Sequence, residues 1–146
     1  MNWKIITVGK PGFVWSRQAV DEYLRRISRY TKVEHVIIRE GAQDQVEAAF
    51  DQASPSGIKI VLDERGRALR STELARWIEA RQLSGSKSAN LFIGGAAGHS
   101  APFRERADEC WSLSALTLQH DIALIVLVEQ IYRAYTILKK EPYHRE

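Results

Sequence analysis

Cysteine is almost absent from this sequence, since Cys110 is the only one among 146 residues. A single cysteine cannot form a disulfide within the chain, which excludes a disulfide-stapled secreted scaffold and favours a reducing cytosol. Long hydrophobic runs are also lacking: the longest, residues 122–128, is far shorter than the about 20 residues that cross a bilayer. No signal-peptide core follows the start, because Lys4 and Lys10 interrupt the first apolar segment. We therefore expect a cytoplasmic protein that does not enter a membrane.

Neither basic nor acidic residues are in strong excess. The 21 Lys and Arg residues against 18 Asp and Glu residues give a net charge of +3 and a pI of about 9.1. This mildly basic balance permits an anionic partner such as nucleic acid but does not require one. Hydrophobic residues make up 45% and charged residues 27%, which is typical of a globular protein and excludes a disordered chain. The length fits one domain, residues 1–146, with its own core.

Strand and helix patterns alternate along the whole chain. Apolar and β-branched residues predict strands over 3–8, 33–38, 58–63, 89–93 and 111–116. Helical spacing and caps predict helices over 13–30, 44–52, from Ser71 or Thr72 to 83, from Pro102 to about 110, and over 122–140, with a charged turn at 64–67. This alternation is typical of an α/β fold with a mostly parallel sheet.

The first turns of the last predicted helix, residues 122–128, are apolar on every side. A helix that is apolar all round must be covered all round. Either it runs through the core of the monomer or a second subunit covers part of it. We favour a dimer interface.

Two segments are candidates for ligand binding. Gly94-Gly95-Ala96-Ala97-Gly98 follows a predicted strand and precedes a helix, where glycines let the backbone approach a ligand. Its spacing is not the G-x-G-x-x-G of dinucleotide-binding folds, and no Lys-Ser or Lys-Thr pair makes it a P-loop. Residues 112–118 mix small hydroxyl residues with leucines at a strand end, where α/β proteins collect ligands. An ordinary turn and a buried strand remain the alternatives.

The sequence gives little support to metal or nucleophile chemistry. It has four histidines: His35, His99, His120 and His144. No two of them have metal-ligand spacing, and Cys110 is expected to pack at the end of a helix. A G-x-S-x-G motif is lacking, so serine hydrolase chemistry is not supported. Glu129 and Arg133, four residues apart, are typical of a structural ion pair.

The end of the chain carries an unusual cluster. Tyr143, His144 and Arg145 directly follow Pro142, which ends the last predicted helix. A histidine can carry a proton near neutral pH, and an arginine can bind a phosphate. The alternative is a frayed basic tail.

Taken in order, these motifs resemble the RlmH family, bacterial methyltransferases of the SPOUT class that modify N3 of a pseudouridine in large-subunit (23S) ribosomal RNA. The resemblance spans nearly the whole chain. Its motifs are residues 62–66 (LDERG), 93–98 (IGGAAG), 112–117 (SLSALT), His120, 129–134 (EQIYRA) and 142–146 (PYHRE). The resemblance implies a C-terminal trefoil knot, which is rare among folds. It also implies a homodimer that acts on ribosomal RNA in the assembled ribosome and needs no metal.

The resemblance also implies S-adenosylmethionine (SAM) as the cofactor, bound in the knot. The positions that would hold it are Leu62, Gly94, Gly95, Leu113, Ser114, Ala115, Leu116, Thr117, Leu118 and Gln119. The leucines can contact the faces of adenine, and the loop backbone can contact its edge. The catalytic candidates are His144, Tyr143 and Arg145 in the tail, with His120 as a second candidate base. His144 would assist removal of the N3 proton, and Arg145 would bind RNA phosphate.

The chain departs from the family pattern at three positions of one loop. Gln119 stands where a proline is usual, Leu124 stands where an arginine is usual, and Asp121 adds a negative charge beside His120. These changes bear on RNA affinity, because phosphate contacts supply much of it. Two alternatives to a methyltransferase follow: a catalytically silent relative that binds RNA or the ribosome, and a small nucleotide-binding oxidoreductase.

Overall fold

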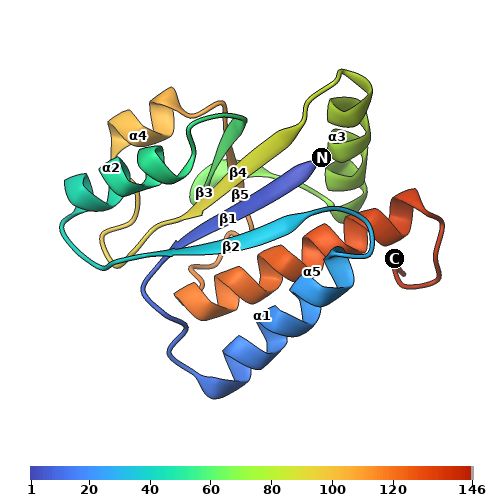
Figure 1. Cartoon of the computed structure of the whole chain (residues 1–146), viewed down its shortest axis with the longest axis horizontal. Coiled ribbons are helices and arrows are strands. Elements are labelled where there is room, and N and C mark those ends of the chain that lie inside the picture. Colours follow the sequence, from blue (N-terminus) through green and yellow to red (C-terminus); the bar gives the residue numbers. More distant parts are fainter. Residues whose placement is uncertain (146) are drawn as a thin grey trace.

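Five strands form one parallel sheet at the centre of the molecule (Figure 1). The structure is a computed structural model that describes residues 1–145, so Glu146, the last residue of the terminal motif, lies outside the described residues. The strands are β1 (Asn2–Val8), β2 (Val33–Ile38), β3 (Ile58–Ala68), β4 (Ser88–Ile93) and β5 (Glu109–Ser112). Their order is β2-β1-β4-β3-β5, and every neighbouring pair is parallel. The predicted α/β fold with a parallel sheet is confirmed.

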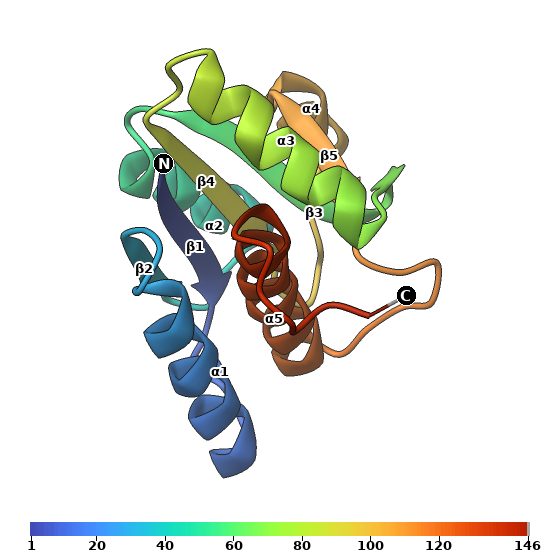
Figure 2. The ribbon, with the colours of Figure 1, turned by 90° about the vertical axis from the view of Figure 1, so that its right-hand side faces the viewer.

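Five helices cover the two faces of this sheet. They are α1 (Val14–Ile27), α2 (Gln43–Ala53), α3 (Ser71–Leu83), α4 (Ala101–Arg106) and α5 (His120–Leu138). Helices α1, α3 and α5 lie on one face and α2 and α4 on the other (Figures 1 and 2). Each face has its own apolar core, and the larger one contains most of the buried side chains of α5. None of the helices in the described range is long and apolar enough to span a membrane.

The charged segment 64–67 is a strand rather than the predicted turn. Strand β3 continues through it to Ala68 and pairs with β5, with a register shift between Leu62 and Arg67. Gly66 permits this, because a Cβ there would lie 2.6 Å from the carbonyl carbon of Cys110. The turn prediction was wrong because charge alone does not end a strand when a bulge lets it continue. As a result Asp63, Glu64 and Arg65 lie beside the carboxyl end of β4.

The segment around Cys110 also differs from expectation. Helix α4 ends at Arg106, and Cys110 lies within β5, so its predicted place at a helix end is wrong. The backbone of Asp108 donates to the carbonyl of Lys59, and its carboxylate accepts from the amide of Lys59, which pulls the chain into the sheet early. Strand β5 consequently ends at Ser112, and residues 113–116, predicted as strand, form a loop.

The start of α3 is capped by a different residue from the two predicted. Arg70 is the N-cap, and its backbone N–H donates to the Glu73 carboxylate at 2.9 Å. The Ser71 hydroxyl instead donates to the side chain of Gln130 on α5. Its hydroxyl therefore ties two helices together rather than closing a helix end.

Helix α5 is the middle helix on its face of the sheet and lies between α1 and α3, with which it makes most of its helix contacts (Figure 2). Leu124, Leu127 and Val128 are buried in the monomer core. Ile122 is 41% exposed, and Ile125 and Val126 are half-buried. The monomer core thus covers one side of the apolar helix start, while Ile122 stays exposed, and the dimer interface stays a prediction.

Candidate functional site

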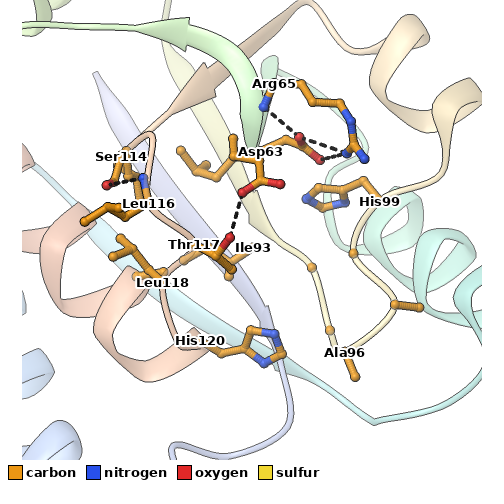
Figure 3. A pocket seen from close by; sticks show the side chains of 18 residues that line it. Asp63, Arg65, Ile93, Ala96, His99, Ser114, Leu116, Thr117, Leu118 and His120 are labelled. Carbon is orange, nitrogen blue, oxygen red and sulfur yellow. Dashed lines mark hydrogen bonds and ion pairs between the residues drawn. The ribbon is translucent and has the colours of Figure 1, made fainter.

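A cavity of about 350 Å³ opens beside the register shift of β3 and the carboxyl end of β4 (Figure 3). Its walls are residues 62–65 of β3, the glycine turn after β4, the loop after β5 and the first turn of α5. In open α/β sheets this edge is the usual place for a ligand. Segments that are far apart in the sequence therefore meet at one site.

Eight of the ten residues predicted to bind a cofactor line this cavity. They are Leu62, Gly94, Gly95, Leu113, Ser114, Leu116, Thr117 and Leu118. The other two do not line it. Ala115 is exposed on the loop, and Gln119 is the N-cap of α5, where its side chain accepts from the amides of Asp121 and Ile122. Gln119 thus fixes the start of α5 through its side chain.

The glycine turn has a structural requirement of its own. Gly98 has φ +66, and its amide donates to the carbonyl of Gly95 at 2.9 Å. A Cβ on Gly94 would lie 3.0 Å from the carbonyl carbon of Gly98. Glycine is needed at position 94 because the turn closes on itself there. The lack of a side chain would also let a ligand come close to the backbone. Helix α2 supports the turn, since Gln43 donates to the carbonyls of Ala97 and Gly98.

The loop after β5 is held in shape by short hydroxyl contacts. The Ser112 hydroxyl donates to the carbonyl of Ser114 at 2.9 Å, and the Ser114 hydroxyl accepts from the amide of Leu116 at 3.0 Å. Across the cavity, the Thr117 hydroxyl donates to the Glu64 carboxylate at 2.9 Å. The loop is therefore anchored at both ends while Leu116 stays 77% exposed. An apolar side chain presented in this way is available to cover a ligand.

Four polar residues of the cavity wall were not among the predicted site residues: Asp63, Glu64, Arg65 and His99. Asp63 is the last residue of the predicted strand 58–63, and this position at the carboxyl end was a signal that could have identified it. Glu64 and Arg65 were predicted to lie in a turn, so their position on the cavity wall was not predicted. His99 had no sequence signal, because nothing in its local pattern distinguishes it from a packed histidine.

The catalytic candidates lie in two places. His120, in the first turn of α5, lines the cavity. His144 lines a second cavity, of about 570 Å³, that shares only Leu113 with the first. Arg145 is exposed at the end of the described chain. Within one chain, the structure therefore brings His120 but not the tail to the predicted cofactor site.

The tail is docked rather than frayed. The Tyr143 hydroxyl donates to the Glu129 carboxylate at 2.8 Å and lies 3.1 Å from the Tyr23 hydroxyl. Burial first, and then the hydrogen bonds to Tyr23 and Glu129, raise the pKa of Tyr143 well above its ordinary value, so its hydroxyl stays protonated. Arg133 pairs with Glu129 at 2.9 Å and lies 3.2 Å from Nδ1 of His144. The predicted Glu129–Arg133 ion pair is confirmed, and it also holds the tail.

Comparisons with known proteins agree with this geometry. A family profile described as "Predicted SPOUT methyltransferase" matches residues 1–144. The chain belongs to the SPOUT methyltransferase family. It is 43% identical over 145 residues to ribosomal RNA large subunit methyltransferase H of Thermus thermophilus, covering 99% of each chain. It is 40% identical over 145 residues to the protein of the same name from Deinococcus radiodurans, again covering 99% of each.

Two solved structures show the same fold at low sequence identity. A probable methylase family protein from Haemophilus influenzae superposes with a TM-score of 0.63 at 13% identity, covering 99% of this chain and 71% of that one. A probable methyltransferase from Bordetella pertussis gives a TM-score of 0.56 at 11% identity, covering 91% and 95%. At these identities the likeness concerns the fold alone.

Two of the three departures from the RlmH resemblance have structural explanations. Leu124 is buried in the larger core, away from the cavity wall. Asp121 is also buried and turns toward α1, where its Oδ2 accepts from the amide of Gly12 at 2.8 Å and lies 2.9 Å from the hydroxyl of Ser16. Its negative charge is thus used to join the starts of α1 and α5, rather than being presented beside His120.

The Asp121→Ala variant is expected to lower the free energy of unfolding by about 2–3 kcal/mol, because it removes a buried charged acceptor that takes hydrogen bonds from Gly12, Phe13 and Ser16. Urea unfolding of the variant and the parent measures this loss. Asp44→Ala is a matched control, since Asp44 is an exposed acidic residue in the first turn of α2. An equal loss in both variants would show that Asp121 acts only as a helix-terminal charge.

Proposed function

We propose that this SPOUT protein transfers the methyl group of SAM to N3 of a pseudouridine in 23S ribosomal RNA, acting on the assembled ribosome. The observation that carries the proposal is the joint placement of the glycine turn and residues 113–118 around one cavity at the carboxyl end of the sheet. Methyltransferases named for large-subunit ribosomal RNA match the chain over its full length, which supports the same substrate here.

The residues of the cavity fit SAM. Leu113, Leu116 and Leu118 supply apolar surface for the faces of an adenine ring. Backbone groups of the loop can meet the edge of the ring, and the opposite wall is polar, as the sulfonium and amino-acid parts require. A group of three or more metal-ligating side chains is not found in residues 1–145. SAM supplies an already activated methyl group, so the chain has to orient the reactants and handle one proton.

Orientation is the main contribution that we assign to the cavity. Holding the acceptor nitrogen close to the methyl carbon in line is worth up to ~7–11 kcal/mol of the barrier. The N3 proton has to leave as the bond forms. We assign this step to His144, with His120 as the second candidate, and the binding of RNA phosphate to Arg145.

The tail and the cavity are separated within one chain, and a homodimer would bring them together. Phe13, Val14, Trp15 and Ile122 are exposed apolar side chains. They lie at the joined starts of α1 and α5, because Asp121 binds the amides of Gly12 and Phe13. An apolar group of this kind is typical of a subunit contact. Two copies meeting here would cover it and form the RNA-binding surface between them.

The trefoil knot belongs to the same proposal. Residues 113–119 leave the edge strand β5 and return over the end of β3, where Thr117 binds Glu64. The chain then enters α5 beneath the sheet. Threading of this segment would create the knot and fix the walls of the cavity at once.

The proposed function is tested by transfer of labelled methyl groups from SAM to ribosomes that lack the modification. We expect incorporation into 23S RNA and binding of SAM by calorimetry. SAM binding without transfer to any RNA would instead favour a silent ribosome-binding relative. Binding of NAD in place of SAM would favour a nucleotide-binding oxidoreductase.

A further inference from the structure

The polar end of the cavity carries a carboxylate that is held in one orientation. The side chain of Asp63 is only 9% exposed and accepts from the backbone amide of Arg65 at 2.9 Å. Nη1 of Arg65 lies 3.2 and 3.3 Å from its two oxygens, and Arg104 stands 4.0 Å away as a second cation. Asp63 thus faces the cavity as a preorganised anion beside an exposed guanidinium.

His99 adds a buried acceptor to the same wall. The residue is 6% exposed, and its ring stacks on Phe103 with the ring centroids 5.5 Å apart. Its Nε2 lies 3.2 Å from the carbonyl of Phe92, which can only accept, so Nε2 carries the hydrogen. Burial lowers the pKa of His99, which keeps the ring neutral. Nδ1 is therefore an acceptor.

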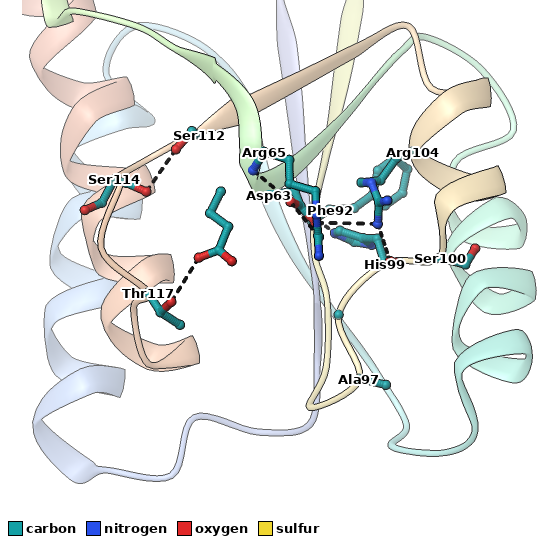
Figure 4. A network of polar contacts seen from close by, with 12 residues as sticks. Asp63, Arg65, Phe92, Ala97, His99, Ser100, Arg104, Ser112, Ser114 and Thr117 are labelled. Atoms are coloured by element: carbon teal, nitrogen blue, oxygen red, sulfur yellow. Dashed lines mark hydrogen bonds and ion pairs between the residues drawn. The ribbon is translucent and has the colours of Figure 1, made fainter.

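Nδ1 of His99 has no hydrogen-bond partner among residues 1–145. Buried acceptors are nearly always satisfied, and one on the wall of a cavity indicates a donor on the ligand. In both close-up views the His99 ring lies beside Asp63 (Figures 3 and 4). Two acceptors, one of them charged, therefore meet at one end of the cavity, with Arg65 at its rim.

We propose that Asp63, Arg65 and His99 form the subsite for the α-amino-acid end of the methyl donor. Asp63 and Nδ1 of His99 accept hydrogen bonds from its α-ammonium group, and Arg65 pairs with its α-carboxylate. The proposal rests on the proposed function, because it assumes that SAM occupies this cavity. It adds a reason for selectivity: carboxylates of Asp63 and Glu64 on the wall disfavour the phosphates of a nucleotide.

Calorimetry with two ligands separates this subsite from the rest of the cavity. S-adenosylhomocysteine carries the amino-acid end, while 5′-deoxy-5′-methylthioadenosine keeps the adenosine and sulfur but lacks that end. We expect the protein to bind the first at least about tenfold more tightly, since hydrogen bonds to charged groups are worth that much. Asp63→Asn and His99→Phe should each lower the affinity for S-adenosylhomocysteine about tenfold and change that for methylthioadenosine by less than about twofold.

The variants are chosen to preserve the fold. Phenylalanine at position 99 keeps the stacking on Phe103 and the tilted ring contact with Phe50, and Asn at position 63 keeps the shape of the carboxylate. His35→Phe is the matched control, because His35 is another histidine whose pKa is lowered by burial but lies on β2, away from the cavity. The His35→Phe variant should bind S-adenosylhomocysteine and methylthioadenosine with the same affinities as the unaltered protein.

Four results would overturn the subsite. Equal binding of the two ligands by the unaltered protein would show that the amino-acid end makes no contact. Unchanged affinity for S-adenosylhomocysteine in both variants would show that these residues do not touch it. Equal loss for both ligands would indicate general damage to the cavity. Binding of neither ligand by the unaltered protein would reject the proposed function, and the subsite with it.

Discussion

The His144→Ala variant is expected to lose about 10²- to 10⁴-fold in the rate of methyl transfer, which is the range for removal of a general base. Its affinity for SAM should not change, because His144 lies in the second cavity, away from the predicted cofactor site. Single-turnover transfer at saturating RNA and SAM measures the loss directly. Full turnover in this variant would show that the tail does not supply the base, and His120→Ala would then be expected to carry the defect.

A mixing experiment tests whether the tail acts on a neighbouring subunit. Leu116→Asp places a charge in the cavity, and His144→Ala removes the base from the tail, so each homodimer alone should be inactive. Mixed dimers contain one site with an intact cavity and an intact tail. Equal mixing should restore about a quarter of the parent activity, because half the dimers are mixed and half their sites are intact. No recovery would place both residues in a site made by one chain.

The Leu116→Ala variant is expected to lose about tenfold to a hundredfold in SAM affinity, which is the effect of no longer burying a leucine against a ligand. Its free energy of unfolding should stay within about 0.5 kcal/mol of the parent, because an exposed side chain adds little to the folded state. Calorimetry and urea unfolding measure the two quantities. Because Leu116 is 77% exposed, we expect its replacement to change the affinity for SAM without changing the free energy of unfolding.

Leu83→Ala is the matched control for this variant. Leu83 is 83% exposed at the end of α3 and does not line the cavity. Its replacement should leave both SAM affinity and stability unchanged. If the two variants bind SAM equally well, Leu116 does not cover the cofactor, and the loop after β5 has another role.

Sequence patterns predict the elements of this fold well where local and tertiary preferences agree. Strand β2, with valine or isoleucine at four of its six positions, has the bounds that were predicted for it. The extension of β3 was not predictable, since it depends on the close contact of Gly66 with the backbone of Cys110 on another strand. The same limit applies to Asp108, whose hydrogen bonds to Lys59 start β5.

The candidate site was also only partly predictable from the sequence. The positions that follow a strand or a glycine turn, such as Leu62 and Gly95, could be assigned from motifs because the backbone places them. Polar partners supplied by side chains were harder to assign. Asp121 was expected to alter RNA binding, yet it joins two helices, because its partners Gly12 and Ser16 lie more than a hundred residues away in the sequence. His99 likewise acquires its place only when α4 packs on the sheet.

The central proposal is tested most directly by labelled methyl transfer to ribosomes that carry either pseudouridine or plain uridine at the target position. We predict label on 23S RNA of the pseudouridine ribosomes alone, with the methyl group at N3. Equal labelling of the pseudouridine ribosomes and the uridine ribosomes would contradict the predicted selectivity for pseudouridine. No label on either, with SAM still bound, would contradict the activity and would favour a catalytically silent relative that binds RNA or the ribosome.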